Sequence, residues 1–295
     1  MILLGMQRKI TRDLHINIAN KTMSYIYNHI DTSINLDELA SNFEVSKKHL
    51  HHVFKEQLGI NIYESIKSIR LQKASNLLLT NKYSTITQIA NMCGYSSQSS
   101  FIKAFKERFE QTPKGWRNGG HELYSNTIFK NSLLKDSLPN FDTSKVRIVK
   151  TQDRPIYYIR QKGYIVEEAK QKWQQLQAWV YTNNLDTYEQ IGIYHDNPAI
   201  TPHAKCFYIA AISPVNEVLD TNMPSNTLEG GLYATFDLYG GDREAAWFIK
   251  WAYHKWLPKS GFETTTDPSF LIMHKNHFLE DNEIDATFYL PIRSV

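Results

Sequence analysis

The hydrophobic positions of residues 36–59 recur in residues 86–110. Partners lie 50 positions apart before a central turn and 51 positions apart after it, so the second copy has one extra residue in its turn. Each copy has the spacing of two short helices joined by a tight turn, which is the helix-turn-helix pattern. The repeated apolar residues of the first copy are Leu36, Leu39, Ala40, Leu50, Phe54 and Leu58.

Polar residues at the expected helix starts support these boundaries. Asn35 with Glu38 and Thr85 with Gln88 have the spacing of a capping box at the first helix of each copy. Ser46 is expected to cap the second helix of the first copy. The two copies are therefore predicted to start and stop in the same way.

A helical pattern of apolar residues also fills the stretch between the copies, at residues 62–78. A helix of about 18 residues would be about 27 Å long. A rigid connector of that length could hold two recognition helices about 34 Å apart, which is one turn of B-DNA. With a further amphipathic helix predicted at residues 16–30, the first domain is expected to be all-helical.

Beyond residue 145 the pattern changes from helical spacing to alternation. The predicted order is strand, helix, strand, strand within residues 146–215, and the same order returns within residues 230–292. This predicts an α+β domain built from two strand–helix–strand–strand repeats, so the fold class is multidomain. The segment before it is polar and has no clear period, which indicates a linker. The expected boundaries are residues 1–120, 121–145 and 146–295.

Charge divides the chain at the same place. Residues 1–120 hold 16 Lys and Arg against 9 Asp and Glu, a balance of +7. The rest holds 17 against 21, a balance of −4, although the whole chain carries only +3. A basic first part favours a polyanionic partner, and an acidic second part favours a different role.

Other sequence features exclude several classes of protein. The two cysteines, Cys93 and Cys206, lie in unrelated segments, so we expect neither a disulfide framework nor a cysteine metal pair. His49 and His52 are one helical turn apart, but zinc needs three or four ligands and no third is nearby. No apolar run reaches 18 residues and no signal peptide is recognisable. We therefore expect a cytoplasmic protein with no membrane association, no metal and no cofactor.

Residues 73–117 resemble the signature of the AraC/XylS transcriptional regulators. The shared features are an A-x-x-L-L segment, an I-A-x-x-x-G-Y turn, an F-x-x-x-F-K helix and a closing T-P-x-x-W-R. The match extends back to about residue 16. The resemblance implies that the partner is promoter DNA and that the second helix of each copy enters the major groove.

The resemblance also implies which residues contact DNA. The outward residues expected to read bases are Lys47, Lys48, His51 and His52 in the first copy and Gln98, Ser99, Ile102 and Lys103 in the second. Gln suits adenine, Lys suits guanine, and Ile can pack on a thymine methyl group. Phosphate contacts are expected from Lys82, Lys106, Arg108, Lys114 and Arg117. The alternative for the lysines is an ordinary solvated face, whereas Phe101, Phe105 and Phe109 are expected to be core.

Residues 146–292 resemble the gyrase-inhibitor-like effector-binding domain. The segments that carry the resemblance are Gly163-Tyr164, "GIYHDNP", "LEGGLYA" and "WLPKSGF". The resemblance implies a cleft between the two halves that binds a bulky hydrophobic or aromatic compound, as in multidrug sensing. Candidate lining residues are Tyr158, Tyr164, Trp173, Tyr194, Tyr233, Trp247 and Trp251. The alternative is that most of these rings are ordinary core.

One position departs from that family's pattern. Leu271 follows Phe270 where the family often carries a glutamate, which would pair with a cationic ligand. Without it a buried cation would lack its partner. The sequence thus favours a neutral effector, a different acid such as Glu280 or Glu283, or a pocket that has lost its function.

The leading interpretation is a transcriptional regulator that binds DNA as a monomer and senses a hydrophobic small molecule. A second hypothesis makes the C-terminal domain a small-molecule hydrolase. Its candidate groups are scattered and no G-x-S-x-G elbow occurs, so we expect no enzyme. A third hypothesis makes it a protein-interaction module, for RNA polymerase or another partner. The candidate hydrolase groups are His195, Asp196, His203 and Glu229.

Overall fold

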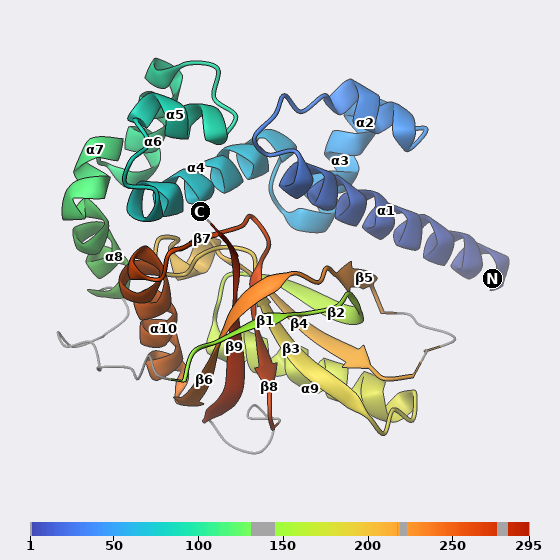
Figure 1. Cartoon of the computed structure of the whole chain (residues 1–295). Helices are drawn as coiled ribbons and strands as arrows, with labels where there is room; N and C mark the ends of the chain where they lie inside the picture. Colours follow the sequence, from blue (N-terminus) through green and yellow to red (C-terminus); the bar gives the residue numbers. More distant parts are fainter. Residues whose placement is uncertain (1, 131–144, 217, 219–222, 276–282, 295) are drawn as a thin grey trace. The chain divides into compact units, whose positions relative to one another are not determined.

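The chain folds into two compact units (Figure 1). The first comprises residues 1–74 and 84–110, and the second comprises residues 75–83 and 111–295. The boundary passes through a helix, α4 (Ile62–Thr80). The residues that the computed structural model describes are 2–130, 145–216, 218, 223–275 and 283–294.

The first unit is all-helical and contains both helix-turn-helix copies, as the hydrophobic pattern predicts. The predicted connector at 62–78 is α4, and the upstream helix is longer than the predicted 16–30. Its elements, besides part of α4, are α1 (Ile2–Asn28), α2 (Leu36–Asn42), α3 (Lys47–Leu58), α5 (Ile86–Met92) and α6 (Gln98–Phe109).

Ser46 and Thr85 cap their helices as predicted, whereas Asn35 accepts from the amides of Asp37 and Glu38 without forming the complete capping box. The Thr85 hydroxyl accepts from the Gln88 amide while the Gln88 side chain accepts from the Thr85 amide, a complete capping box. Ser46 accepts from the amide of His49 at 3.1 Å. Gly94, in the turn of the second copy, has φ of 72°, and a Cβ there would lie 2.7 Å from the Ile30 carbonyl oxygen and from Arg70. That turn therefore requires glycine.

The second unit is built on an antiparallel sheet (Figure 1). Within the described residues the strand order is β1-β6-β9-β8-β3-β4-β2-β5, and β7 pairs separately with β9. The strands are β1 (Arg147–Lys150), β2 (Arg154–Lys162), β3 (Tyr188–Tyr194), β4 (Phe207–Pro214), β5 (Ser225–Leu228), β6 (Leu232–Gly240), β7 (Phe262–Thr264), β8 (Ser269–Met273) and β9 (Ile284–Ser294).

The predicted repeat is visible in the strand order. One half is β2, α9 (Val166–Thr182), β3 and β4, and the other is β6, α10 (Asp242–Trp251), β8 and β9. The order β6-β9-β8 on one side mirrors β2-β4-β3 on the other, and β3 pairs with β8 at the centre. The two halves thus meet edge to edge and form one sheet.

The two faces of the sheet carry separate apolar clusters because side chains alternate along each strand. On β4, Tyr208, Ala210 and Ile212 belong to the cluster that also contains the buried faces of α9 and α10. Ile209 and Ala211 belong to the cluster on the opposite face. Both helices therefore cover the same face of the sheet.

A helix occupies the start of the segment that was predicted to be a linker. It is α8 (His121–Lys130), which follows α7 (Pro113–Gly115) and a π-helical turn at Trp116–Gly120. Its buried residues are His121, Ser125 and Phe129, four apart on one side of the helix. The rest of the predicted linker, residues 131–144, lies outside the described residues.

Candidate DNA-reading helices and the effector-domain core

The outward face of α6 carries the residues that the sequence predicted to read bases. Gln98, Ser99 and Lys103 are exposed, and Ile102 is partly exposed. The opposite side packs Phe101, Phe105 and Phe109, each fully buried, with adjacent ring centroids 5.6 and 4.6 Å apart. The prediction that these three rings are core is confirmed, and the core fixes which side of α6 faces out.

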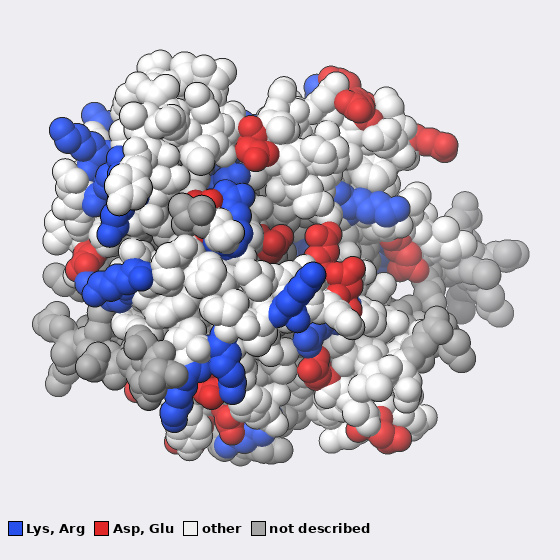
Figure 2. Space-filling view, in the orientation of Figure 1, with Lys and Arg blue, Asp and Glu red and all other residues white. Residues whose placement is uncertain are grey.

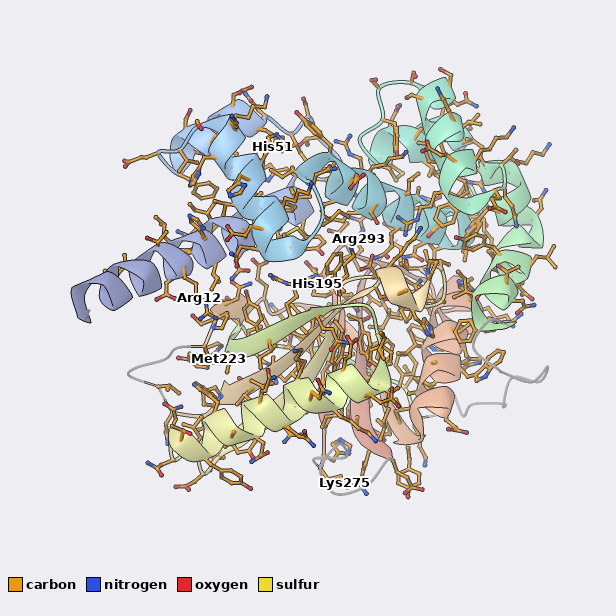
Figure 3. All side chains as sticks on the ribbon, turned by 180° about the vertical axis from the view of Figure 1, so that it is seen from behind. Arg12, His51, His195, Met223, Lys275 and Arg293 are labelled. Carbon is orange, nitrogen blue, oxygen red and sulfur yellow. The ribbon has the colours of Figure 1, made fainter. Side chains whose placement is uncertain are left out.

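The outward face of α3 is built in the same way. Lys48 and His52 are exposed, whereas Lys47 and His51 are partly exposed. The inward side buries Leu50, Val53, Phe54 and Leu58. The ring of His51 (Figure 3) lies 5.4 Å from that of Tyr63, the second residue of α4, which is 58% exposed. Sequence reasoning did not select Tyr63, because its place beside His51 depends on how α4 leaves the first copy.

Two of the predicted base readers are held by a side chain from the preceding helix. Lys47 Nζ lies 2.9 Å from Oδ2 of Asp37 on α2. Gln98 Oε1 accepts a 2.8 Å hydrogen bond from the Thr87 hydroxyl on α5. Both contacts lie inside the first unit, and neither partner was selected from the sequence.

The residues predicted to contact phosphates differ in their exposure and in the unit to which they belong. Lys106 is exposed on α6, and Lys82 and Lys114 are exposed in the second unit. Arg117 is partly buried there. Arg108 donates to the Ser68 hydroxyl at 2.6 Å and lies over the Phe109 ring, so it is engaged within the first unit. Figure 2 shows acidic and basic side chains interspersed on the visible face.

The aromatic candidates of the second unit divide between three places. Tyr158 and Tyr233 belong to the apolar cluster on the face opposite the helices. Trp247 lies against α8, with its ring 5.1 Å from that of Phe129. The helix-covered core contains Trp173, Tyr194, Trp251 and Leu271, with Tyr164 packed against it.

One group of these rings surrounds Tyr208, which the sequence analysis did not select. Its hydroxyl accepts from Trp173 Nε1 at 3.0 Å, and both side chains are buried. Tyr164 and Tyr194 lie 5.2 and 5.4 Å from its ring. Opposite, a Cβ at Gly192 would approach the Tyr208 hydroxyl to 2.9 Å. Glycine at position 192 therefore leaves room for the Tyr208 ring to lie against strand β3.

Leu271 is fully buried in that core and pairs with Gly192 across the central strands. Glu283, an alternative acid for a cationic ligand, accepts from the exposed Tyr239 hydroxyl, and Glu280 lies outside the described residues. Among the described residues, Glu263 is the one buried carboxylate. It accepts from Arg293 (Figure 3), at 2.7 Å from Nε and 2.6 Å from Nη2.

The groups considered for hydrolysis serve separate structural contacts. His195 (Figure 3) is partly buried, and desolvation lowers its pKa to about 3, so it is neutral at pH 7. The Asp196 carboxylate accepts from the Phe207 amide at 2.9 Å. His203 lies beside the rings of Phe129 and Tyr164. The Glu229 carbonyl accepts from a tyrosine hydroxyl.

The contact between α8 and α10 gathers several ionisable groups within the second unit. Lys250 Nζ donates to Asn126 at 2.7 Å and lies 4.9 and 4.7 Å from the ring centroids of Phe129 and Trp247. Burial lowers the pKa of Lys250 to about 8, and the charge of Glu122 partly offsets the shift. Glu122 itself pairs with Lys255.

A histidine pair lies at the same contact. His121 Nδ1 donates a 3.1 Å hydrogen bond to the Trp116 carbonyl oxygen, and the His121 ring meets that of His254 edge to face at 5.2 Å. His254 is buried, and neither of its ring nitrogens has a hydrogen-bond partner among the residues that the structure describes. Burial, followed by the nearby positive groups, lowers the pKa of His254 well below 6.5.

Comparison with known families identifies both parts of the chain. Residues 144–293 match the GyrI-like small molecule binding domain. The chain belongs to the GyrI-like family. Residues 39–119 match a helix-turn-helix domain, and this part is of the AraC type. The two resemblances seen in the sequence are thus confirmed.

Two bacterial regulatory proteins are similar to about a third of the chain. The xylose operon regulatory protein of Escherichia coli K12 is 35% identical over 103 residues, covering 35% of this chain and 26% of that protein. The HTH-type transcriptional activator RhaS of Escherichia coli O139:H28 is 31% identical over 100 residues, covering 34% and 36%. The chain therefore spans well under half the length of either relative.

Solved structures match over a similar stretch. The C-terminal domain of AraT, a response regulator from Geobacillus stearothermophilus, is 30% identical, with a TM-score of 0.33, covering 34% of this chain and 84% of that one. In the described part of the chain no helix is long and apolar enough to cross a membrane. The described residues also contain no group of three His, Cys, Asp or Glu suited to a metal ion.

Proposed function

We propose that the protein is a transcriptional regulator that binds promoter DNA through α3 and α6 and a hydrophobic small molecule through its GyrI-like domain. The observation that carries the DNA part is the construction of α6. A buried phenylalanine ladder directs Gln98, Ser99 and Lys103 outward, and α3 repeats the arrangement. The names of the relatives, an operon regulatory protein and a transcriptional activator, support the same role.

The connector supports binding by a single chain. α4 has 19 residues, so it is about 29 Å long. A helix of that length is suited to holding two recognition helices on successive major grooves. One copy of the chain would then contact two half-sites. The proposed role places the protein in the cytoplasm, where it would meet chromosomal DNA.

The DNA role is tested by selection from a randomised pool of duplex DNA with the full chain. We expect the pool to converge on one sequence, and Lys103→Ala to reduce discrimination against single-base variants by about 1–3 kcal/mol. Lys205→Ala, which removes an exposed lysine from the GyrI-like domain, is the matched control and should change nothing. A wild-type protein that selects no sequence would contradict the proposal.

For the second domain we propose a neutral hydrophobic effector. Leu271 stands where the family often has an acid, and the one buried carboxylate among the described residues, Glu263, already accepts from Arg293. Among the described residues, a cationic compound would therefore meet no buried carboxylate whose charge is not already paired with a cation. The domain family is described as small-molecule binding, which supports an effector of this kind.

The effector role is tested by thermal denaturation with matched pairs of neutral and cationic aromatic compounds of equal size. A compound that binds the native state raises the melting temperature. We expect neutral members of the pairs to raise it more than cationic ones. A larger shift with the cationic members would show that another group supplies the counter-charge, and no shift with either would favour a protein-interaction role.

A further inference from the structure

The two helix-turn-helix copies share a contact that the repeat does not require. In each copy the second residue of the first helix meets the first residue of the second helix: Asp37 meets Lys47, and Thr87 meets Gln98. The partners are 10 residues apart in one copy and 11 in the other, because the second turn is one residue longer. The two contacts thus occupy equivalent positions in the two copies, but one is an ion pair and the other is a neutral hydrogen bond.

In the first copy the contact is an ion pair. Lys47 donates a hydrogen bond to Asp37, which raises the pKa of Lys47 and keeps the ammonium group charged. Its charge is balanced locally, and the Asp37 side chain is 72% exposed beside it. A carboxylate that close to the DNA backbone would be repelled by phosphates. Asp37 therefore opposes the contribution that Lys47 would otherwise make to binding any DNA sequence.

In the second copy the contact is a neutral hydrogen bond. The Thr87 hydroxyl donates to Gln98 Oε1, which fixes the amide and leaves its nitrogen directed to the other side. The amide oxygen has a second lone pair, so it can still accept from the amino group of adenine while the nitrogen donates to the ring. An amide that is already oriented loses less side-chain freedom on binding.

We propose that Asp37 and Thr87 are positioning residues that give the two copies opposite roles: Asp37 weakens sequence-independent attraction at Lys47, and Thr87 orients Gln98 to read one base pair. This inference rests on the proposed binding of DNA. It goes beyond that proposal because it assigns the difference between the copies to residues that lie on the first helix of each, α2 and α5.

Each half of the inference has a variant with a characteristic effect. Asp37→Asn should tighten binding to selected and random DNA alike, and should steepen the salt dependence by about one released ion. Thr87→Val should lower discrimination at a single base pair by about fivefold or more, with the salt dependence unchanged. Thr87→Ser keeps the hydroxyl and should restore the discrimination.

Both residues also lie in the first turn of a helix, where an acid or a capping contact adds stability. Double variants separate that structural role from the proposed one. Asp37→Asn should tighten DNA binding by less when Lys47 is already methionine (Lys47→Met), because only the direct repulsion between Asp37 and the phosphates is then relieved. Thr87→Val should not affect discrimination when Gln98 is already alanine (Gln98→Ala). A purely structural role would give the same effect in both backgrounds.

The measurements use the full chain, the duplex selected by the wild-type protein, its single-base variants and a random duplex, at several salt concentrations. Unchanged affinity and salt dependence in Asp37→Asn would overturn the first half of the inference. Unchanged discrimination in Thr87→Val, or no rescue by Thr87→Ser, would overturn the second. Failure of the wild-type protein to select any sequence would instead overturn the proposed function.

Discussion

The two halves of the GyrI-like domain have the same strand order but different helices. α9 is a regular helix of 17 residues that ends at Thr182. α10 has 10 residues and runs on into a π-helical turn, Ala252–Trp256, and then a 3-10 turn. The turn carries His254 and Lys255, which contact α8. The helix of one half packs on the sheet, whereas the helical segment of the other half also contacts α8, the helix that follows the DNA-binding part.

The first way to test this comparison is to remove a large core ring from each half. Trp173→Ala on α9 and Trp251→Ala on α10 should each cost about 3–5 kcal/mol, because the two rings belong to one continuous cluster. Trp173→Ala also leaves the Tyr208 hydroxyl without its donor. Chemical denaturation should show a single transition of the domain shifted in both variants. Separate transitions for the two halves would show that they are independent units.

A second test addresses Lys250, which is specific to the half that meets α8. Lys250→Met removes a buried cation but keeps the volume, so we expect the free energy of unfolding at pH 7 to be unchanged or higher by about 1–3 kcal/mol. The folded-state pKa of about 8 lies below the ordinary 10.5, so wild-type stability should rise with pH between those values. The variant should lose that rise.

Lys255→Met is the matched control for Lys250→Met. Lys255 pairs with Glu122 at a contact that is partly open to solvent, so its loss should change stability by less than about 1 kcal/mol. A larger loss in Lys250→Met than in Lys255→Met would mean that the contacts with Phe129, Trp247 and Asn126 outweigh the burial of the charge.

The smallest expected effect is the contribution of His254 to the loss of stability at acidic pH. The folded-state pKa of His254 lies below 6.5, so the unfolded state takes up the proton first and stability falls as pH drops below about 6.5. Each such histidine adds about 1.4 kcal/mol per pH unit to that fall. His254→Phe keeps an aromatic ring against His121. It should reduce the slope of stability against pH by the contribution of one histidine.

Much of the fold follows from periodicity in the sequence. The duplicated helix-turn-helix, its caps at Ser46 and Thr85 and the two strand–helix–strand–strand halves were predicted because apolar spacing and capping residues are local signals. α8 was missed because its buried side consists of His121, Ser125 and Phe129, and two of these three are polar. Only the contact with α10 shows that this side is buried.

The candidate sites were predictable to different degrees. The outward residues of α6 follow from the phenylalanine ladder, since burying one side of a helix exposes the other. The contacts of Asp37 and Thr87 depend on the geometry of a turn, which residue types do not specify. The aromatic candidates fell on both faces of the sheet because Tyr158 and Trp173 have the same character in the sequence, and only the pairing of the strands separates them.

The continuous helix α4, which runs from the first copy to the second, has a consequence for how target sites could change. One inserted residue would turn everything beyond it by about 100° and advance it by about 1.5 Å. Seven inserted residues would nearly restore the angle while adding about 10 Å, close to three base pairs of DNA. The permitted distance between half-sites would therefore change in steps set by the helical turns of α4, and not by single residues.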